Sequence, residues 1–180
     1  MSLKLLIEKC KNHDTNAQSE LYKLFSRKMF SLCLKYSRNR TEAEDVLQDS
    51  FLTIFEKIGQ YQEKGSFEGW MKRIVINTAL QRYRGQSVLN IVDEAKIEDV
   101  SVSVETDDLS LDFLLRCIQE LPDRYRLVFN LYVLDGYSHK QIATMLDITT
   151  GTTKSNLARA RMILKEKIEI HKSQVNLQSI

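Results

Sequence analysis

The chain has 180 residues, enough for one domain or two small ones, and 43% of them are hydrophobic, as in an ordinary globular protein. One proline and six glycines favour a mostly helical, all-α fold, and no apolar run approaches the roughly 20 residues of a membrane-spanning helix. Residues 1–85 hold 15 basic against 10 acidic side chains, residues 86–110 one against seven, and residues 111–180 10 against seven. Two basic bodies therefore flank an acidic connector.

A first domain, residues 1–85, is predicted to contain four helices. They are expected at residues 3–10, about 17–38, 41–59 and 67–84. Thr41 and Glu44 have the spacing of a capping box and should open the third helix, and Ser66 should cap the fourth. The third helix has a predicted buried stripe of Val46, Leu47, Ser50, Phe51, Ile54, Phe55 and Ile58.

Residues 86–109 lose helical periodicity and turn acidic, so we expect a mostly extended or disordered linker. A second helical domain is predicted at residues 110–172, with a tail at 173–180. Its first helix should begin near Ser110 and end before Pro122. Pro122 suits the first turn of the next helix, which should run to Leu134 and stop at Gly136.

Residues 136–161 have the pattern of a helix-turn-helix. Ser138 can cap the first helix with help from Gln141, Asp147 suits a left-handed turn residue, and Thr149 can cap the second helix. The second helix offers polar and basic groups at Thr152, Thr153, Lys154, Ser155, Asn156, Arg159 and Arg161, and an apolar side at Leu157, Ala160 and Leu164. This is typical of a recognition helix. An ordinary helical hairpin with a basic, solvated face is the alternative.

The sequence shows no pattern of catalytic chemistry. Cys10, Cys33 and Cys117 form no CxxC pair and lie in apolar patterns, so we expect reduced core residues of a cytoplasmic protein. The N-terminus lacks a signal-peptide pattern, the three histidines are isolated, and no GxxxxGK[ST] phosphate loop is present. We therefore expect no cofactor, no metal site, no catalytic residues and no insertion into a membrane, hence a protein that is not an enzyme.

Four segments in order resemble sigma factors of the sigma-70 superfamily, and most closely the two-domain extracytoplasmic-function (ECF) group. They are AEDVLQDSFLTIF (43–55), FEGWMKRIVINTALQRYR (67–84), LPDRYRLVF (121–129) and the helix-turn-helix. The resemblance implies two small helical domains, sigma regions 2 and 4. It also implies an alternative sigma factor that directs promoter-specific transcription initiation. Its implied partners are core RNA polymerase (β′ and β subunits), promoter DNA and an anti-sigma factor, which in this family is often anchored in the membrane.

The resemblance also implies which residues of the first domain bind. Region 2.2 docks on the β′ clamp helices, which implies polymerase contacts at Asp45, Gln48, Asp49, Phe51 and Leu52. Regions 2.3 and 2.4 bind and open the −10 element, which implies DNA contacts at Tyr61, Lys64, Trp70, Arg73, Asn77, Gln81, Arg82 and Arg84. Interleaved aromatic and basic side chains suit single-stranded DNA, although Phe67 and Ile74 are expected to be core. Gln81 replaces an acidic residue that is common in the family.

The recognition helix resembles region 4.2, which reads the −35 element. This implies contacts at Thr152, Lys154, Ser155, Asn156, Arg159 and Arg161. Lysine and arginine should hold phosphates, whereas Ser155 and Asn156 suit base edges, and Asn156 replaces the family's usual arginine. In the family the linker threads the polymerase cleft; a plain tether is the alternative. Two other functions compete: a helix-turn-helix regulator that is not a polymerase subunit, and a nucleic-acid enzyme.

Overall fold

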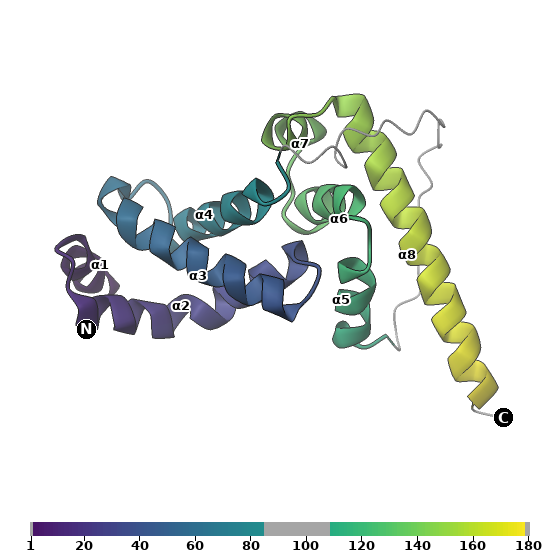
Figure 1. The fold of residues 1–180 in the computed structure, drawn as a ribbon, viewed down its shortest axis with the longest axis horizontal. Coiled ribbons are helices and arrows are strands. Elements are labelled where there is room, and N and C mark those ends of the chain that lie inside the picture. Colours follow the sequence, from purple (N-terminus) through teal and green to yellow (C-terminus); the bar gives the residue numbers. More distant parts are fainter. Residues whose placement is uncertain (1, 85–108, 179–180) are drawn as a thin grey trace. The chain divides into compact units, whose positions relative to one another are not determined.

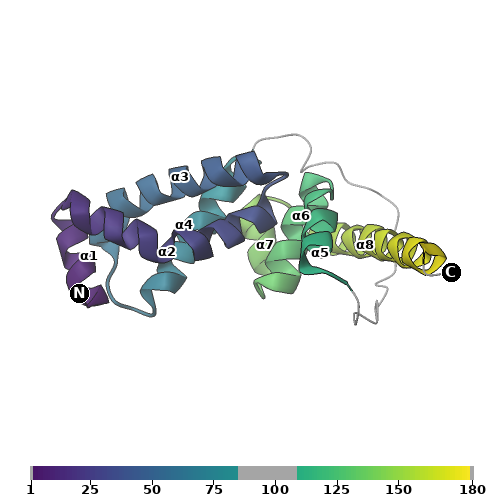
Figure 2. The same ribbon diagram turned by 90° about the horizontal axis from the view of Figure 1, so that it is seen from below.

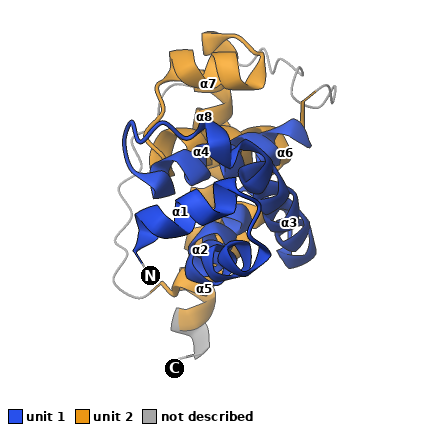
Figure 3. Cartoon of the chain, turned by 90° about the vertical axis from the view of Figure 1, so that its left-hand side faces the viewer, with its two compact units in different colours: residues 1–82 blue, residues 83–180 orange. Residues whose placement is uncertain are grey.

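The computed structural model describes residues 2–84 and 109–178. The chain divides into two compact units, residues 1–82 and 83–180 (Figure 3). All regular elements in the described ranges are helices, which confirms the predicted all-α fold. None of these helices is long and apolar enough to cross a membrane. The predicted linker lies outside the described residues, apart from Leu109.

The first unit is a bundle of four α-helices. Its elements are α1 (Leu3–Lys11), α2 (Thr15–Tyr36), α3 (Arg40–Lys57), the one-turn 3-10 helix η1 (Ile58–Gln60) and α4 (Phe67–Gln81). Each of α2, α3 and α4 packs against the other two, and α1 packs on α2 and η1 (Figures 1 and 2). The fully buried core side chains include Leu21, Met29, Ile54, Met71 and Leu80. Burial of their apolar surface is the main force that holds the bundle together.

Two of the first unit's helices begin earlier than the sequence predicted. Asp14 caps α2 by accepting a hydrogen bond from the backbone N–H of Ala17 (3.0 Å). The predicted capping box at Thr41 is wrong, because Asn39 caps α3 by accepting from the N–H of Glu42 (2.9 Å). The Ser66 cap of α4 is confirmed, since its hydroxyl accepts from the N–H of Gly69 (3.0 Å).

The second unit contains the remaining helices of the described residues. They are α5 (Leu111–Gln119), α6 (Asp123–Phe129), a single π-helical turn η3 (Asn130–Leu134), α7 (His139–Leu146) and α8 (Thr150–Gln178). Leu121 and Tyr125 pack against Ala160 of α8 to form a buried cluster. Pro122 was predicted in the first turn of this helix, and in the structure it is the N-cap of α6, one position earlier. Residues 173–178, predicted as tail, continue α8, which extends beyond α5 and α6 (Figures 1 and 2).

A buried arginine closes the turn between α5 and α6. The guanidinium of Arg126 is 1% exposed and donates to the carbonyl oxygens of Gln119 (3.2 Å) and Leu121 (2.9 Å). It also pairs with the carboxylate of Asp123. The charge is thus neutralised where it is buried, and carbonyls at the end of α5 gain the hydrogen bonds that the helix cannot supply.

The three cysteines are buried and unpaired, as the sequence predicted. Burial raises the pKa of the Cys33 thiol to about 12, so the side chain is a neutral thiol at physiological pH. Among the described residues no group of histidine, cysteine and carboxylate side chains is arranged to hold a metal ion.

Candidate functional site

The outward surface of α3 forms a ridge on the first unit. The side chains of Asp45, Gln48 and Asp49 are exposed, and Leu52 is 69% exposed, an unusual position for a large apolar residue. Phe51 differs, because it is only 3% exposed and its ring lies 4.6 Å from that of Tyr22 on α2. Four of the five predicted polymerase-binding residues therefore lie on an accessible surface, and Phe51 supports it from below.

One predicted DNA-binding residue is paired with this ridge. Arg82, just after α4, donates from Nη2 to Oδ2 of Asp49 (2.9 Å), and its Nη1 lies 3.8 Å from Oδ2 of Asp45. The structure therefore joins one predicted −10 residue to two predicted polymerase contacts. The two carboxylates therefore offset the positive charge of Arg82, which was predicted to bind DNA.

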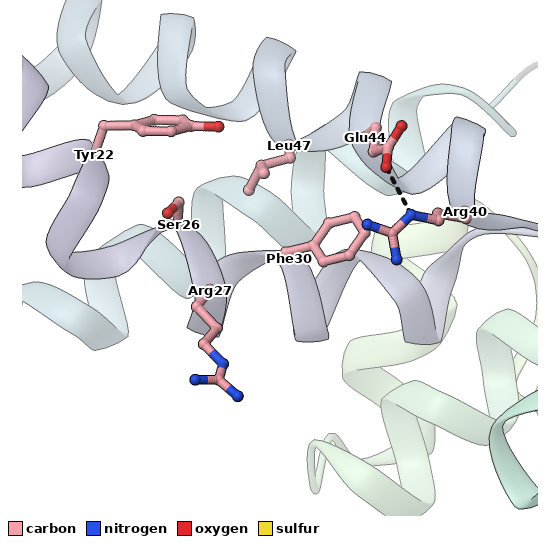
Figure 4. A pocket seen from close by; sticks show the side chains of 7 residues that line it. All are labelled: Tyr22, Ser26, Arg27, Phe30, Arg40, Glu44 and Leu47. Atoms are coloured by element: carbon pink, nitrogen blue, oxygen red, sulfur yellow. Dashed lines mark hydrogen bonds and ion pairs between the residues drawn. The ribbon is translucent and has the colours of Figure 1, made fainter. Parts of the chain in front are cut away.

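A hollow of about 260 Å³ lies between α2 and α3 (Figure 4). It is lined by Tyr22, Ser26, Arg27, Phe30, Arg40, Glu44 and Leu47. The guanidinium of Arg40 lies 5.2 Å from the centre of the Phe30 ring, and its Nε donates to Oε1 of Glu44 (2.8 Å). This hollow was not expected from the sequence, although residues 22, 26 and 30 have the spacing of one helical face.

Three aromatic rings form a cluster at the start of α4. Tyr61 and Phe67 are buried, and the half-buried Trp70 stacks on Phe67 with ring centres 5.5 Å apart. The hydroxyl of Tyr61 donates to the carbonyl oxygen of Gly65 (2.8 Å), which closes the loop that connects η1 and α4. The loop thus has a defined shape above an aromatic floor. Lys64 is exposed on this loop.

The predicted −10 residues of α4 form an exposed stripe. Arg73, Asn77 and Gln81 are spaced by four residues and are all exposed. Asn77 and Gln81 also line a hollow of about 170 Å³ between α3 and α4, with Thr53, Glu56, Lys57, Ile74 and Thr78. Arg84 is exposed but follows the end of α4. The structure therefore gathers the amides of Asn77 and Gln81 at one groove, separate from the aromatic cluster.

Glu68 ties α4 to α2 next to the aromatic cluster. Its carboxylate accepts from Nζ of Lys28 (2.8 Å) and lies 3.0 Å from Nζ of Lys72. The hydrogen bonds from Lys28 and then Lys72 hold the pKa of this carboxyl below its usual range. One carboxylate is therefore shared by two lysines and offsets part of their positive charge beside the aromatic cluster.

The helix-turn-helix prediction is confirmed in the second unit. Ser138 and Gln141 form both bonds of a capping box at the start of α7. Asp147 takes the left-handed conformation, with φ 57° and ψ 50°, and Thr149 accepts from the N–H of Thr152 (3.1 Å) at the start of α8. These local bonds define where both helices start and how the turn between them folds.

The predicted −35 residues lie on different sides of α8. Lys154 is exposed, and Ser155, Arg159 and Arg161 are half-buried. Thr152 and Asn156 are buried, with only 9% and 3% of their surface exposed. This burial counts against the base contact predicted for Asn156. The helical spacing contained the signal, because Asn156 stands four residues before Ala160 on the side that packs.

The fold and these surfaces define a two-unit helical protein with a DNA-binding helix-turn-helix. Family models for sigma-70 region 2 and sigma-70 region 4 match residues 21–88 and 113–164. The chain belongs to the sigma-70 family, and within it to the ECF group. It is an alternative sigma factor, which directs RNA polymerase to promoters, and the members of this family are not enzymes. The rival interpretation as an independent regulator explained only residues 136–161, whereas the match covers both units.

Known proteins of the ECF group are similar over most of the chain. The ECF RNA polymerase sigma factor SigW of Bacillus subtilis is 27% identical over an alignment 186 residues long, gaps included, that covers 93% of this chain and 97% of SigW. SigM of Mycobacterium tuberculosis is 29% identical over 168 residues, covering 92% and 84% of the two chains. The sigma factor RpoE in its complex with the anti-sigma factor NepR from Bartonella quintana has a similar fold. It has a TM-score of 0.52 and 23% identity, covering 84% of this chain and 96% of RpoE.

Proposed function

We propose that this sigma factor holds a promoter with both units, the first binding the opened −10 element and the second the duplex −35 element. The strongest support is the fully capped helix-turn-helix, whose second helix presents Lys154 to solvent from its second turn. Two contacts joined by one chain act at high effective concentration, so neither unit needs to bind DNA tightly alone.

In the first unit, the loop at residues 60–66 and Trp70 form the site for a base of the non-template strand. Flipping a base out of the duplex costs a few kcal/mol of unstacking, and stacking on an aromatic ring returns about 1–3 kcal/mol. Trp70 supplies the ring, and Lys64 supplies a nearby cation for the backbone. Asn77 and Gln81, in the groove between α3 and α4, read the neighbouring base edges with their amides.

In the second unit, Lys154, Arg159 and Arg161 bind phosphates, and Ser155 contacts a base edge in the major groove. Thr152 and Asn156 are buried and support this surface from within α8. The exposed Thr150 and Gly151 at the N-terminus of α8 add backbone amides that favour a phosphate.

Core polymerase binds the ridge of α3, whose exposed side chains include Asp45, Gln48 and Leu52. Leu52, at 69% exposure, is the apolar anchor, and the carboxylates select a basic partner surface. The hollow between α2 and α3 borders this ridge through Glu44 and Leu47, and accepts a further side chain of the polymerase.

An anti-sigma factor is a second protein partner. The sigma factor RpoE from Bartonella quintana is known in complex with one. On this chain, Leu24, Leu52 and Val133 are large apolar residues that are 45% or more exposed, and such surface favours a protein partner. The protein acts in the cytoplasm, where polymerase is, and has no catalysis of its own. Failure to recover a partner by pull-down from uninduced cells would count against sequestration.

Run-off transcription with core polymerase on a promoter library tests the central proposal. The chain should confer promoter-specific transcripts that depend on both elements, and the chain without polymerase should not retard promoter duplex. Asn77→Ala should relax preference within the −10 element and Ser155→Ala within the −35 element. Transcripts that ignore either element would refute the assignment of that unit.

A further inference from the structure

His139 touches both the π-helical turn and the recognition helix. It is the first residue of α7, and its ring stacks on Tyr132 of η3 with centres 4.4 Å apart and planes inclined by 22°. Its Nδ1 lies 3.0 Å from Oγ1 of Thr153, in the first turn of α8. The side chain is half-buried, whereas Thr153 is fully buried. One imidazole thus connects three consecutive elements of the second unit.

The hydrogen bonds of Thr153 define the direction of this contact. The Thr153 hydroxyl has one proton, and it donates that proton to the carbonyl oxygen of Thr150 (2.8 Å). Thr153 Oγ1 must therefore accept from His139, which assigns a proton to Nδ1 of the imidazole. Because a neutral Nδ1–H imidazole and an imidazolium both carry this proton, the bond persists in either state.

The bond acts on the part of α8 that approaches DNA. Thr153 directly precedes Lys154 and Ser155, the residues proposed to bind a phosphate and a base edge of the −35 element. The Thr153 hydroxyl is itself bonded within the first helical turn, so a shift of His139 would move that turn. Recognition helices contact bases mostly through their N-terminal residues, where a small rotation changes which edge is reached.

We propose that His139 is a positioning residue for −35 recognition, which orients the first turn of α8 through its Nδ1–H bond to Thr153 and its stack on Tyr132. This inference rests on the proposed −35 function of α8. His139 itself does not touch DNA. Its role is to hold Lys154 and Ser155 in the geometry that distinguishes one −35 sequence from another.

The test compares variants that separate the hydrogen bond from the ring stack. His139→Phe retains an aromatic ring against Tyr132 but removes the donor, and Thr153→Val retains the buried shape but removes the acceptor. Transcription with core polymerase is measured on a promoter with the preferred −35 element and on one with its base pairs exchanged. Each variant should lower the ratio of the two signals by roughly fivefold to tenfold, the worth of one hydrogen bond.

Two further results are specific to positioning. The double variant should lose no more discrimination than Thr153→Val alone, since that variant already removes the bond to His139, together with the bond from the Thr153 hydroxyl to the Thr150 carbonyl. His139→Asn should keep a higher ratio than His139→Phe, because its amide can donate near the position of Nδ1, and a lower ratio than the unchanged chain, because it lacks the ring that stacks on Tyr132. Thermal unfolding of each variant is measured in parallel. If His139→Phe does not fold, the comparison of Thr153→Val with the unchanged chain provides the test.

His171→Phe is the matched control in the same unit. His171 also stacks on an aromatic ring, that of Phe113 at 3.9 Å, but lies far along α8 from its first turn. It should leave the −35 ratio unchanged. If His139→Phe and Thr153→Val also leave it unchanged while Ser155→Ala lowers it, the positioning role is overturned and the proposed function stands. If Ser155→Ala leaves the ratio unchanged and Lys154→Gln leaves the transcript level of both promoters unchanged, both are overturned.

Discussion

Asn156 is a polar side chain on the packed side of the recognition helix. It is 3% exposed, and its Nδ2 has no hydrogen-bond partner among the described residues. A buried donor left without a partner costs about 1–3 kcal/mol. Replacing it with an apolar side chain of similar size removes this cost and should not disturb DNA contacts.

We therefore predict that Asn156→Leu raises the free energy of unfolding by about 1 kcal/mol and leaves −35 base preference unchanged. Urea unfolding of the purified chain measures the first quantity, and transcription from a −35 library measures the second. Ser155→Ala is the comparison, since it should change preference with little effect on stability. If Asn156→Leu changes the −35 base preference, that result would instead support the base contact predicted from the sequence.

At this scale the sequence predicts local structure better than binding roles. The cap residues Ser66, Ser138 and Thr149 are predicted correctly because capping depends on a side chain and an amide three positions away. Helical spacing also indicates that Phe51 and Asn156 face inward, because Phe51 belongs to the predicted buried stripe and Asn156 stands four residues before Ala160. The binding roles predicted for these two residues came from the family resemblance and not from their spacing.

At the level of the element, the start of α3 shows how two capping residues compete. Asn39 and Thr41 both have side chains that can cap, and in the structure Asn39 bonds the N–H of Glu42 (2.9 Å). Asn39→Ala should lower the free energy of unfolding by roughly 0.5–2 kcal/mol, whereas Thr41→Ala, at an exposed position inside the first turn, should change it little. Urea unfolding of both variants checks this. An equal loss in both would contradict the assigned cap.

Glu68 links two elements, α2 and α4, through Lys28 and Lys72. Because its pKa is lowered in the folded state, its contribution to stability is present above the ordinary pKa of 4.5 and is lost as pH falls through the lower, folded pKa. Glu68→Gln should therefore lower the free energy of unfolding at pH 7 by roughly 0.2–1 kcal/mol, the range of exposed ion pairs, and by less at low pH.

Urea unfolding at pH 7 and at about pH 3 measures this difference, and Glu20→Gln on α2 is the control with the same charge change. Glu20 is exposed on α2, and its replacement by Gln removes the same charge at a solvated position, so we expect it to change the free energy of unfolding equally at both pH values. A loss in Glu68→Gln that is independent of pH would show that its ion pairs are not the cause.

The sequence predicts which helices form better than it predicts where each helix ends. The apolar periodicity and caps identified every α-helix in the described ranges. The π-helical turn η3 was not predicted, because a widened turn leaves no local pattern that differs from an α-helix. The extension of α8 to Gln178 reflects the absence of glycine or proline after Gly151, so nothing stops the helix where its apolar stripe weakens.

At the level of the whole molecule, each unit has its own core and its own proposed DNA element. Asn77 and Lys154 are exposed and belong to different units, and no side chain within residues 2–84 and 109–178 binds both of them. Free energies of substitutions that act independently add within about 0.5 kcal/mol. If the two units bind the −10 and −35 elements as proposed, removing one contact in each unit should therefore lower the free energy of promoter binding by the sum of the two single losses.

The measurement is the dissociation constant of the holoenzyme for one promoter, determined for Asn77→Ala, Lys154→Gln and the double variant at fixed salt. Each single change should weaken binding by about 1 kcal/mol or more, roughly fivefold, as expected for loss of one hydrogen bond or one phosphate contact. The double variant should then weaken it roughly 25-fold, the product of the two. A double variant no weaker than one single variant would mean that the −10 and −35 contacts form and break as one unit, in which case the two basic bodies do not contribute independently.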